Sequence, residues 1–370
     1  MPRVRILHTT EYQYALPVRL TEHRLMMRPR DSHDLRLLDA TLWITPPGAR
    51  TRWAHDVFGN SVCFLDWRGA STKTLRIVSA LDLQHYPVLA DLPIDPSAET
   101  YPFRYAGDEY PDLSRLIEPH HPDPDRKVEG WARRFLKPAG NTPTRELLIA
   151  MTEAIKSDFT YEARESKGTH APLHTLAERR GACRDFAVLM MEAARSLGFA
   201  ARFVSGYLYD EELVDSVDPM VGGGSTHAWC AIYLPGAGWV EYDPTNGLIA
   251  GRNLIRVSMA REPHQATPLS GGYIGRADDF RSMRVEVEVT VGDPPTPEEQ
   301  ALRAVRREAA REAEARAVGA RPAEAQPAGA ALVPEAPEEP LEVVADRAPS
   351  PSAQRELDLS RPLEVDVEPS

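Results

Sequence analysis

The sequence predicts an α+β protein in which an antiparallel β-sandwich is followed by helices packed on an antiparallel sheet. Three observations carry this prediction: short β-type runs fill the first hundred residues, apolar residues then recur at helical spacing, and strand-like runs return from residue 200. A block of strands following a block of helices is typical of the α+β class. The 370-residue chain is long enough for two or three domains with sizeable cores.

Six short runs near the N-terminus have the composition of β-strands, and Pro, Gly and Asn separate them. Because no helical pattern lies between them, they favour a small antiparallel sandwich. Gly59-Asn60 has the composition of a tight hairpin turn. The runs cover residues 4–14, 22–28, 37–44, 51–57, 61–67 and 75–83.

Residues 90–121 are rich in Pro, Asp and Tyr, which predicts a connector. Helical periodicity follows, with apolar residues at i, i+3, i+4 and i+7 from Val128. The pattern repeats after Pro143 and again over residues 183–197. Gly198 then stands where a C-terminal cap belongs.

Strand-like runs at residues 200–209, 226–234 and 239–242 follow the helices and predict an antiparallel meander. A polar, Gly-rich segment at 210–225 lies between the first two runs, and we interpret it as a flexible loop that could gate a site. Residues 283–291 alternate apolar and acidic side chains, which predicts a half-buried strand.

The sequence suggests a β-rich region (1–105), a core of helices and strands (106–292) and, where the composition changes sharply, a tail (293–370). The tail contains no aromatic residue, and its 17 acids and 9 arginines give a charge of −8. Such a segment cannot bury enough apolar surface to offset its ordering entropy, so we expect disorder and a role, if any, in binding a protein partner. The other residues carry 38 acids and 34 bases, or −4, which does not favour nucleic acid.

No apolar run approaches the roughly 20 residues that span a bilayer, and the N-terminus lacks the apolar block of a signal peptide. The chain has three cysteines, an odd and sparse count that fits a reducing compartment. We therefore expect a cytoplasmic protein without a membrane partner. The sequence contains no Cys-x-x-Cys and no phosphate-binding glycine loop, so we expect no metal and no cofactor.

Cys183 is the first candidate for chemistry, because it follows Gly181 and opens a predicted helix. The free N–H groups and the dipole of a helix N-terminus stabilise a thiolate, and they can also stabilise an oxyanion formed by its attack on a carbonyl. The alternative is a buried structural cysteine, since free cysteines are among the most buried residues.

His227 and Asp243 are the second and third candidates, placed on neighbouring predicted strands. Adjacent antiparallel strands can bring two such side chains together. A carboxylate there would fix the imidazole tautomer and support its positive charge. Taken singly, His227 could be a core histidine, and Asp243-Pro244 could simply start a turn.

Four separated blocks around these residues resemble the transglutaminase-like superfamily, which shares its catalytic core with papain-like thiol enzymes. The resemblance covers roughly residues 3–292 and includes the β-rich N-terminal region of the bacterial branch. It implies a papain/transglutaminase-like core in which Cys183 is the nucleophile, His227 the general base and acid, and Asp243 the orienting carboxylate. The chain differs from the family at residues 260–264, where it reads Ala-Arg-Glu-Pro-His. The blocks are Gly181-x-Cys183-Arg184-Asp185-Phe186-Ala187, the strand at 202–208, His227-Ala228-Trp229 and the segment at 238–247, joined by Tyr12-x-Tyr14 and Asp56-x-Phe58-Gly59-Asn60 in the N-terminal region.

The expected activity is thiol-dependent chemistry on carboxamide or peptide bonds through a thioester acyl-enzyme. Hydrolysis is favoured over transamidation because water needs no dedicated site. A catalytically silent binding module is the rival from another class.

Several other residues have structural interpretations. We expect Asp185 to cap its helix, with Arg184 or another base as partner, rather than to act in catalysis. Trp229 is expected to shield the site by packing, and His120-His121 to be a solvated linker. Pro172 between His170 and His174 makes a shared helix face unfavourable. Cys63 and Cys230 are expected to be strand packing residues.

Overall fold

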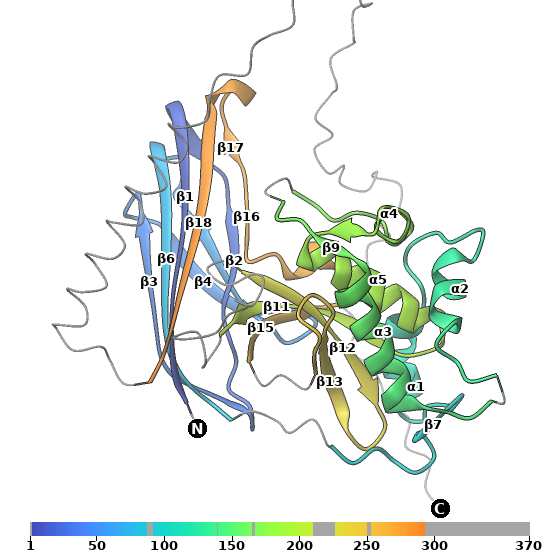
Figure 1. Ribbon diagram of the computed structural model, residues 1–370. Coiled ribbons are helices and arrows are strands. Elements are labelled where there is room, and N and C mark those ends of the chain that lie inside the picture. The colour runs from blue at the N-terminus through green and yellow to red at the C-terminus, as the bar shows by residue number, and fades with distance from the viewer. Residues whose placement is uncertain are drawn as a thin grey trace, which may run out of the picture. The chain divides into compact units, whose positions relative to one another are not determined.

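Two facing antiparallel sheets and a separate helix-covered sheet dominate the part of the chain that the computed structural model describes, which is residues 2–86, 92–138, 140–164, 167–209, 226–249 and 253–292. The predicted α+β class is confirmed (Figure 1). The expected gating loop at 210–225 and the expected disordered tail at 293–370 lie outside the described residues. Within the described part, no helix combines the length and apolarity that a bilayer crossing requires.

The first sheet of the sandwich is organised around β1 (Arg3–Leu20). This strand pairs on one side with β6 (Ser71–His85), which in turn pairs with β3 (Leu35–Thr45). Buried and more exposed side chains alternate along β6, as expected for a strand with one face against a core. The inward residues Leu75, Ile77, Leu81 and Leu83 are at most 3% exposed.

The other side of β1 pairs with a strand from the far end of the described chain, β18 (Phe280–Val291). Val4 lies opposite Val291, and Tyr12 lies opposite Met283. The strand predicted at 283–291 is therefore present. Its pairing adds it to the sheet of the N-terminal region, although the sequence analysis placed it in the core at 106–292. The boundary at residue 105 stays a prediction.

The second sheet of the sandwich has the order β16-β2-β5-β4. The apolar layer between the two sheets includes Leu25, Leu65 and Trp67. The predicted hairpin turn joins β4 and β5 and spans residues 56–60. Asp56 holds it by accepting hydrogen bonds from the backbone N–H groups of Phe58 and Asn60. The strand bounds are His23–Arg28 (β2), Arg50–His55 (β4), Ser61–Asp66 (β5) and Leu269–Ser270 (β16); β17 (Tyr273–Ile274) pairs with β1.

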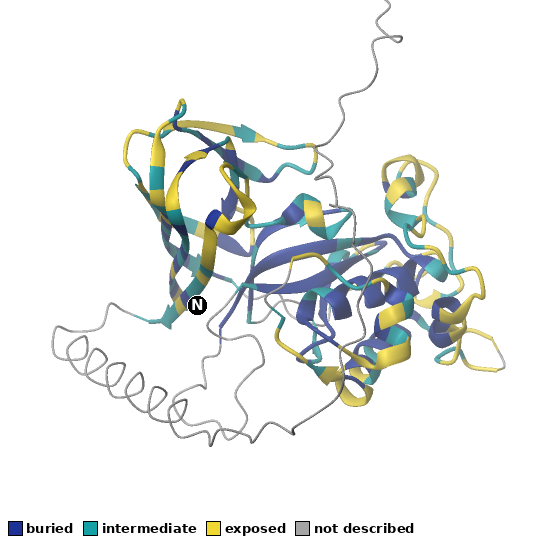
Figure 2. Ribbon diagram, turned by 90° about the horizontal axis from the view of Figure 1, so that it is seen from above, coloured by how far each residue is buried: buried dark blue, intermediate teal, exposed yellow. Residues whose placement is uncertain are grey.

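The sheet of the core is antiparallel, with the order β14-β13-β12-β11-β15. Figure 2 shows its strands as almost continuously buried, unlike those of the sandwich. The predicted meander is thus present, and a further strand, β15, joins it. The bounds are Ala201–Leu208 (β11), His227–Leu234 (β12), Gly238–Asp243 (β13), Leu248–Ile249 (β14) and Leu254–Ala260 (β15).

Helix α5 (Cys183–Ser196) packs on β11 and β12 and is buried along most of its length. It ends before Gly198, whose φ of +88° is the left-handed conformation of a glycine cap, as predicted. The expected connector contains a helix, α1 (Tyr110–Ile117), because a proline fits the first turn and Leu113 is buried.

The remaining helices surround α5. They are α2 (Lys127–Arg133), α3 (Thr144–Asp158) and α4 (Pro172–Glu178), with short 3₁₀ turns at η1 (Pro263–Ala266) and η2 (Ala277–Asp279). Two short strand pairs complete the described chain: β7 (Thr100–Tyr101) with β8 (Thr142–Pro143), and β9 (Thr160–Tyr161) with β10 (Arg180–Gly181).

Asn60 links the sandwich to the core. Its side-chain amide donates a hydrogen bond to Met259 O at 2.7 Å and accepts one from Met259 N at 2.9 Å. The turn at residues 56–60 is thereby attached to the backbone of β15 through both backbone groups of Met259.

Candidate active site

Cys183 is the first residue of α5 and is 8% exposed. The preceding Ala182 is extended, and its N–H donates a hydrogen bond of 2.9 Å to the carboxylate of Asp185, which fixes where the helix begins. A β-carbon on Gly181 would lie 3.0 Å from Asp185 Cβ, so glycine permits this close packing. The thiol therefore lies at a helix N-terminus, where unpaired N–H groups and the helix dipole favour negative charge.

Asp185 is fully buried and is held as a structural group. Its carboxylate accepts hydrogen bonds from Arg164 at 2.7 and 2.8 Å and from the N–H of His170 at 2.7 Å. The expected capping role agrees with this geometry. Its charged partner is Arg164 rather than Arg184, because the guanidinium of Arg184 donates to the carbonyl oxygens of Gly168 and Arg164.

His227 and Asp243 form a buried pair. His227 opens β12 and Asp243 ends the neighbouring β13, and His227 Nε2 lies 2.8 Å from Asp243 Oδ2. Since a carboxylate oxygen accepts, Nε2 is the nitrogen that donates. His227 Nδ1 is buried without a hydrogen bond to any described residue. Besides Asp243, the Cys183 thiol also raises the pKa of this imidazole. The structure thus brings together the three residues that the sequence singled out.

The two charges of the pair support each other. Burial by itself would lower the pKa of His227, but the charge and hydrogen bond of Asp243, with a smaller effect of Cys183, outweigh it and raise this pKa to about 10. Burial by itself would raise the pKa of Asp243, but the charge of His227 and the hydrogen bonds to the carboxylate hold this pKa below its usual value. Each member of the pair therefore favours the charged form of the other.

The turn after β13 holds the Asp243 carboxylate in place. Oδ1 accepts the N–H of Thr245 at 2.9 Å, and Oδ2 accepts the side-chain amide of Asn246 at 2.8 Å. Gly247 closes the turn with φ of +68° and donates its N–H to Asp243 O at 2.8 Å. The Asp-Pro-Thr-Asn-Gly sequence is thus a structure that orients one carboxylate.

Trp229 covers the imidazole, as predicted. Its ring is fully buried and stacks on His227 with centroids 5.8 Å apart and planes at 27°. Gly206 permits this packing, because a β-carbon there would lie 2.8 Å from the Trp229 ring and 2.1 Å from Ile255 O. The indole keeps water away from one face of the imidazole.

The other two cysteines are packing residues, as predicted. Cys63 on β5 and Cys230 on β12 are fully buried, and all three cysteines are free. Burial raises the pKa of Cys63 to about 11 and that of Cys230 still further above the ordinary value. Both therefore remain neutral thiols at physiological pH.

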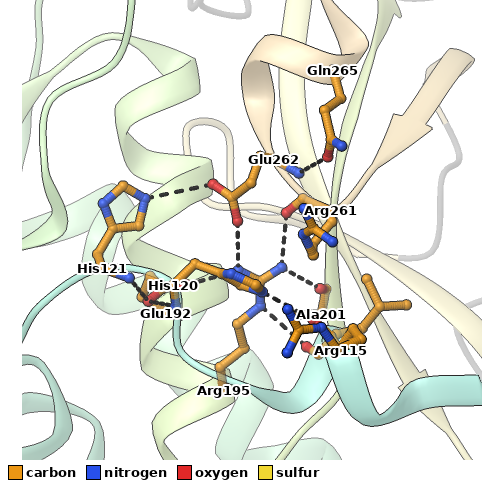
Figure 3. A network of polar contacts seen from close by, with 10 residues as sticks. Arg115, His120, His121, Glu192, Arg195, Ala201, Arg261, Glu262 and Gln265 are labelled. Carbon is orange, nitrogen blue, oxygen red and sulfur yellow. Dashed lines mark hydrogen bonds and ion pairs between the residues drawn. The ribbon is translucent and has the colours of Figure 1, made fainter. Parts of the chain in front are cut away.

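The sequence suggested that His120 and His121 belong to a solvated linker, and this prediction is wrong. Their backbone N–H groups donate to Glu192 Oε2 at 2.9 and 3.0 Å, and His121 Nε2 lies 3.6 Å from Glu262 Oε2 (Figure 3). The hydrogen bond to Glu262 raises the pKa of His121 despite burial. The prolines around these residues suggested a solvated segment, but the buried Glu192 and the partly buried Glu262 bind it to the core.

The same network explains the segment at 260–264. The Arg195 side chain is fully buried and donates to Glu192 at 2.7 Å, to Glu262 at 3.1 Å and to three backbone carbonyls (Figure 3). The backbone N–H of Glu262 donates a hydrogen bond to the side-chain oxygen of Gln265. In this structure the segment anchors α5 to the end of β15.

Sequence reasoning missed Arg164, which neutralises Asp185 beneath the helix N-terminus. The two residues are 21 positions apart, and nothing in the spacing of Arg164 signals the contact. His170 precedes α4 and His174 lies within it, as the intervening proline suggested. The centroids of their rings are 4.5 Å apart.

Comparison with protein families gives two matches. Residues 130–244 match the family model described as the transglutaminase-like superfamily, and residues 4–84 match the bacterial transglutaminase-like N-terminal region. The first match spans Cys183, His227 and Asp243.

Similar whole chains are known. An uncharacterized protein of Mycobacterium tuberculosis is 28% identical over 300 residues, which is 79% of this chain and 94% of that one. One of Mycobacterium leprae is 28% identical over 294 residues, or 78% of this chain and 99% of that one. A solved structure of a candidate cysteine protease from Cytophaga hutchinsonii covers 80% of this chain and 92% of its own, with 19% identity and a TM-score of 0.57. The last likeness is one of fold.

Proposed function

Because the chain belongs to the transglutaminase-like superfamily, we propose that it is a cysteine-dependent enzyme that acts on amide or peptide bonds through a thioester acyl-enzyme. Cys183 is the nucleophile, His227 the general acid and base, and Asp243 the residue that orients His227. The observation that carries the proposal is the buried 2.8 Å contact between His227 Nε2 and Asp243 Oδ2, which leaves Nδ1 for the thiol.

The reaction follows from this arrangement. The thiolate of Cys183 adds to the carbonyl carbon, and the imidazolium of His227 gives its proton to the departing amine. A thioester remains on the sulfur. Water then attacks the thioester, with His227 as base, and an acid leaves.

Hydrolysis is the outcome that we favour, since water needs no binding site of its own. Transamidation differs only in the second step, where a substrate amine replaces water. The choice depends on whether the site binds an amine and excludes water.

We propose that the substrate is a peptide or another carboxamide. A cleft of about 860 Å³ lies on the sandwich, where we propose that it holds a part of the substrate away from the reacting bond. Its lining includes Lys167 but none of Cys183, His227 and Asp243. Ligand pockets commonly measure about 300–1,000 Å³. Tyr12 and Tyr273 give the cleft aromatic walls that could hold side chains of a peptide.

The test uses the full chain and a defined mixture of synthetic glutamine-containing peptides, with hydroxylamine as a nucleophile. Cys183-dependent hydroxamates would demonstrate an acyl-enzyme, and mass spectrometry of the products without hydroxylamine would show cleavage or deamidation if hydrolysis is correct. Incorporation of an added primary amine in preference to water would favour transamidation. No product that depends on Cys183, judged against Cys183→Ala, together with no acyl adduct from p-nitrophenyl acetate, would leave a binding module as the function.

The cellular location belongs to the same proposal. The three cysteines are free, and a thiol nucleophile works best where it stays reduced. We propose the cytoplasm, with fractionation of the source cells as the check.

A further inference from the structure

Tyr161 lies next to the beginning of α5 because of a short parallel strand pair. In the register of β9 and β10, Tyr161 is the partner of Gly181, which is two residues before Cys183. The N–H of Glu162 donates to Gly181 O at 2.9 Å and fixes this pairing. The Tyr161 side chain is half-buried and packs against the hydrophobic cluster that includes Cys183 and Phe186.

The phenol of Tyr161 is a hydrogen-bond donor beside the beginning of α5. Within the described part of the chain its hydroxyl makes no hydrogen bond to another residue. Burial is the main cause that raises the pKa of Tyr161, and negative charge on Cys183 raises it further. The phenol therefore keeps its proton at neutral pH, also when Cys183 is a thiolate.

Addition of a thiolate to a carbonyl creates a need for such a donor. The carbonyl π electrons move onto oxygen as the S–C bond forms, and two donors usually stabilise the resulting oxyanion. The N-terminus of α5 supplies backbone N–H groups on one side. A second donor has to come from a neighbouring element, and Tyr161 is on the strand that pairs with the residues leading into α5.

We infer that Tyr161 donates its hydroxyl hydrogen to the oxyanion formed at Cys183, as the second donor of the oxyanion hole. The inference rests on the proposed function. When the tetrahedral adduct collapses, the electron pair returns from oxygen to re-form the C=O bond, the leaving group departs with its own bonding pair, and the Tyr161 hydroxyl keeps its proton throughout.

The experiment measures acylation of the full chain by p-nitrophenyl acetate, in which the thiolate displaces p-nitrophenolate in a burst. Tyr161→Phe should slow the burst by on the order of 10²-fold, the usual effect of losing one such donor. Alkylation of Cys183 by iodoacetamide forms no oxyanion, so its rate should be unchanged. The sulfur of a thiocarbonyl group accepts hydrogen bonds only weakly. The wild type should therefore react faster with p-nitrophenyl acetate than with its thiono (C=S) analogue, and this preference should shrink in Tyr161→Phe.

Tyr233→Phe is the matched control, because it removes a hydroxyl that donates to Glu109. It should leave the burst rate unchanged. Replacing Tyr161 by 3-fluorotyrosine, which keeps the shape and strengthens the donor, should maintain or raise the rate.

A normal burst in folded Tyr161→Phe would overturn the inference alone, and so would an equal loss of burst rate and of alkylation rate. Absence of any Cys183-dependent burst in the wild type would overturn the proposed function, and the inference with it.

Discussion

The imidazole of His8 on β1 and the hydroxyl of Tyr207 on β11 share a hydrogen bond of 2.9 Å, although they are 199 residues apart. His85 and Tyr209 repeat the contact, also at 2.9 Å, between β6 and the residue after β11. In the core sheet the residue before Tyr207 is the register partner of His227. The sandwich therefore holds the end of the strand beside which the candidate catalytic histidine lies.

These two contacts predict sensitivity to acid. Burial lowers the pKa of His8 and of His85 to about 4, below the unfolded value near 6.5. Between these values the unfolded chain binds more protons, so the free energy of unfolding should be fully retained above pH 6.5 and fall as the pH drops toward 4. Each histidine should account for up to roughly 3 kcal/mol of the loss. Urea titrations from pH 7.5 to 4.5 measure it.

The control is His8→Gln, which keeps a polar side chain but does not titrate. Its unfolding free energy should depend less steeply on pH in this window than that of the wild type. Parallel curves for the two proteins would show that His8 is not a source of the acid sensitivity.

The sequence allowed prediction of those features that reside in a local pattern. Alternation predicted the strand at 283–291, which is β18, and the glycine after residue 197 predicted the end of α5. The resemblance of four spaced blocks to a known family indicated Cys183, His227 and Asp243 as one site. The strand, the helix end and the His227–Asp243 pair depend on neighbouring residues or on two strands joined by a short turn, whereas Cys183 was joined to the pair by the family resemblance.

The contacts that fix the site in space could not be read in this way. Arg164 meets Asp185, β18 pairs with β1, and His121 meets Glu262. The partners lie 21 residues apart in the first case and more than a hundred apart in the other two, so only the folded chain brings them together. The assignment of His121 to a solvated linker was wrong for this reason.

The buried Arg195 predicts a large loss of stability on substitution. Its side chain makes five hydrogen bonds or ion contacts, including those to Glu192 and Glu262. Arg195→Met fills similar space but leaves two acids without their cation, and breaking such a buried pair costs about 3–5 kcal/mol. Thermal and urea unfolding measure the effect.

Arg115→Ala is the comparison, because it removes an exposed ion pair with Glu118. Exposed pairs of this kind contribute about 0–1 kcal/mol. Similar losses in the two variants would mean that the Arg195 network contributes no more than a surface contact.

The thiols should differ in reactivity. Cys183 lies at a helix N-terminus with 8% exposure, whereas Cys63 and Cys230 are fully buried thiols with raised pKa values. Iodoacetamide at pH 7, followed by peptide mass mapping, should modify Cys183 at least ten times faster than either, since only thiolates react. Labelling of Cys63 or Cys230 at the rate of Cys183 would contradict its assignment as the nucleophile.

Removing residues 293–370 should leave the protein's stability and activity intact. This segment has no aromatic residue and carries a charge of −8, so we expect that it contributes little apolar burial. A chain that ends at Gly292 retains the hydrogen bond from its N–H to Arg3 O. Melting temperature and the acetate burst compare the two lengths; a clear drop in either would assign the tail a structural or catalytic role.

The last prediction concerns Asp243 and His227 as a coupled pair. Asp243→Asn preserves the shape of the side chain but removes the charge that raises the pKa of His227, so the imidazole should lose its proton near neutral pH and could adopt the wrong tautomer. The corresponding change in a serine triad lowers kcat by about 10⁴-fold. We expect a loss on the order of 10²–10⁴-fold, because a thiolate depends less on a base.

His227→Ala should be at least as damaging, since it removes the proton donor for the leaving amine. The double variant should lose little more than His227→Ala alone, because residues that act as one unit are not additive. The measurement is kcat/KM on a peptide amide, with circular dichroism to verify folding. Fully additive losses would show that the two residues act independently, and normal activity in folded Asp243→Asn would remove Asp243 from the catalytic set despite its 2.8 Å contact with the imidazole.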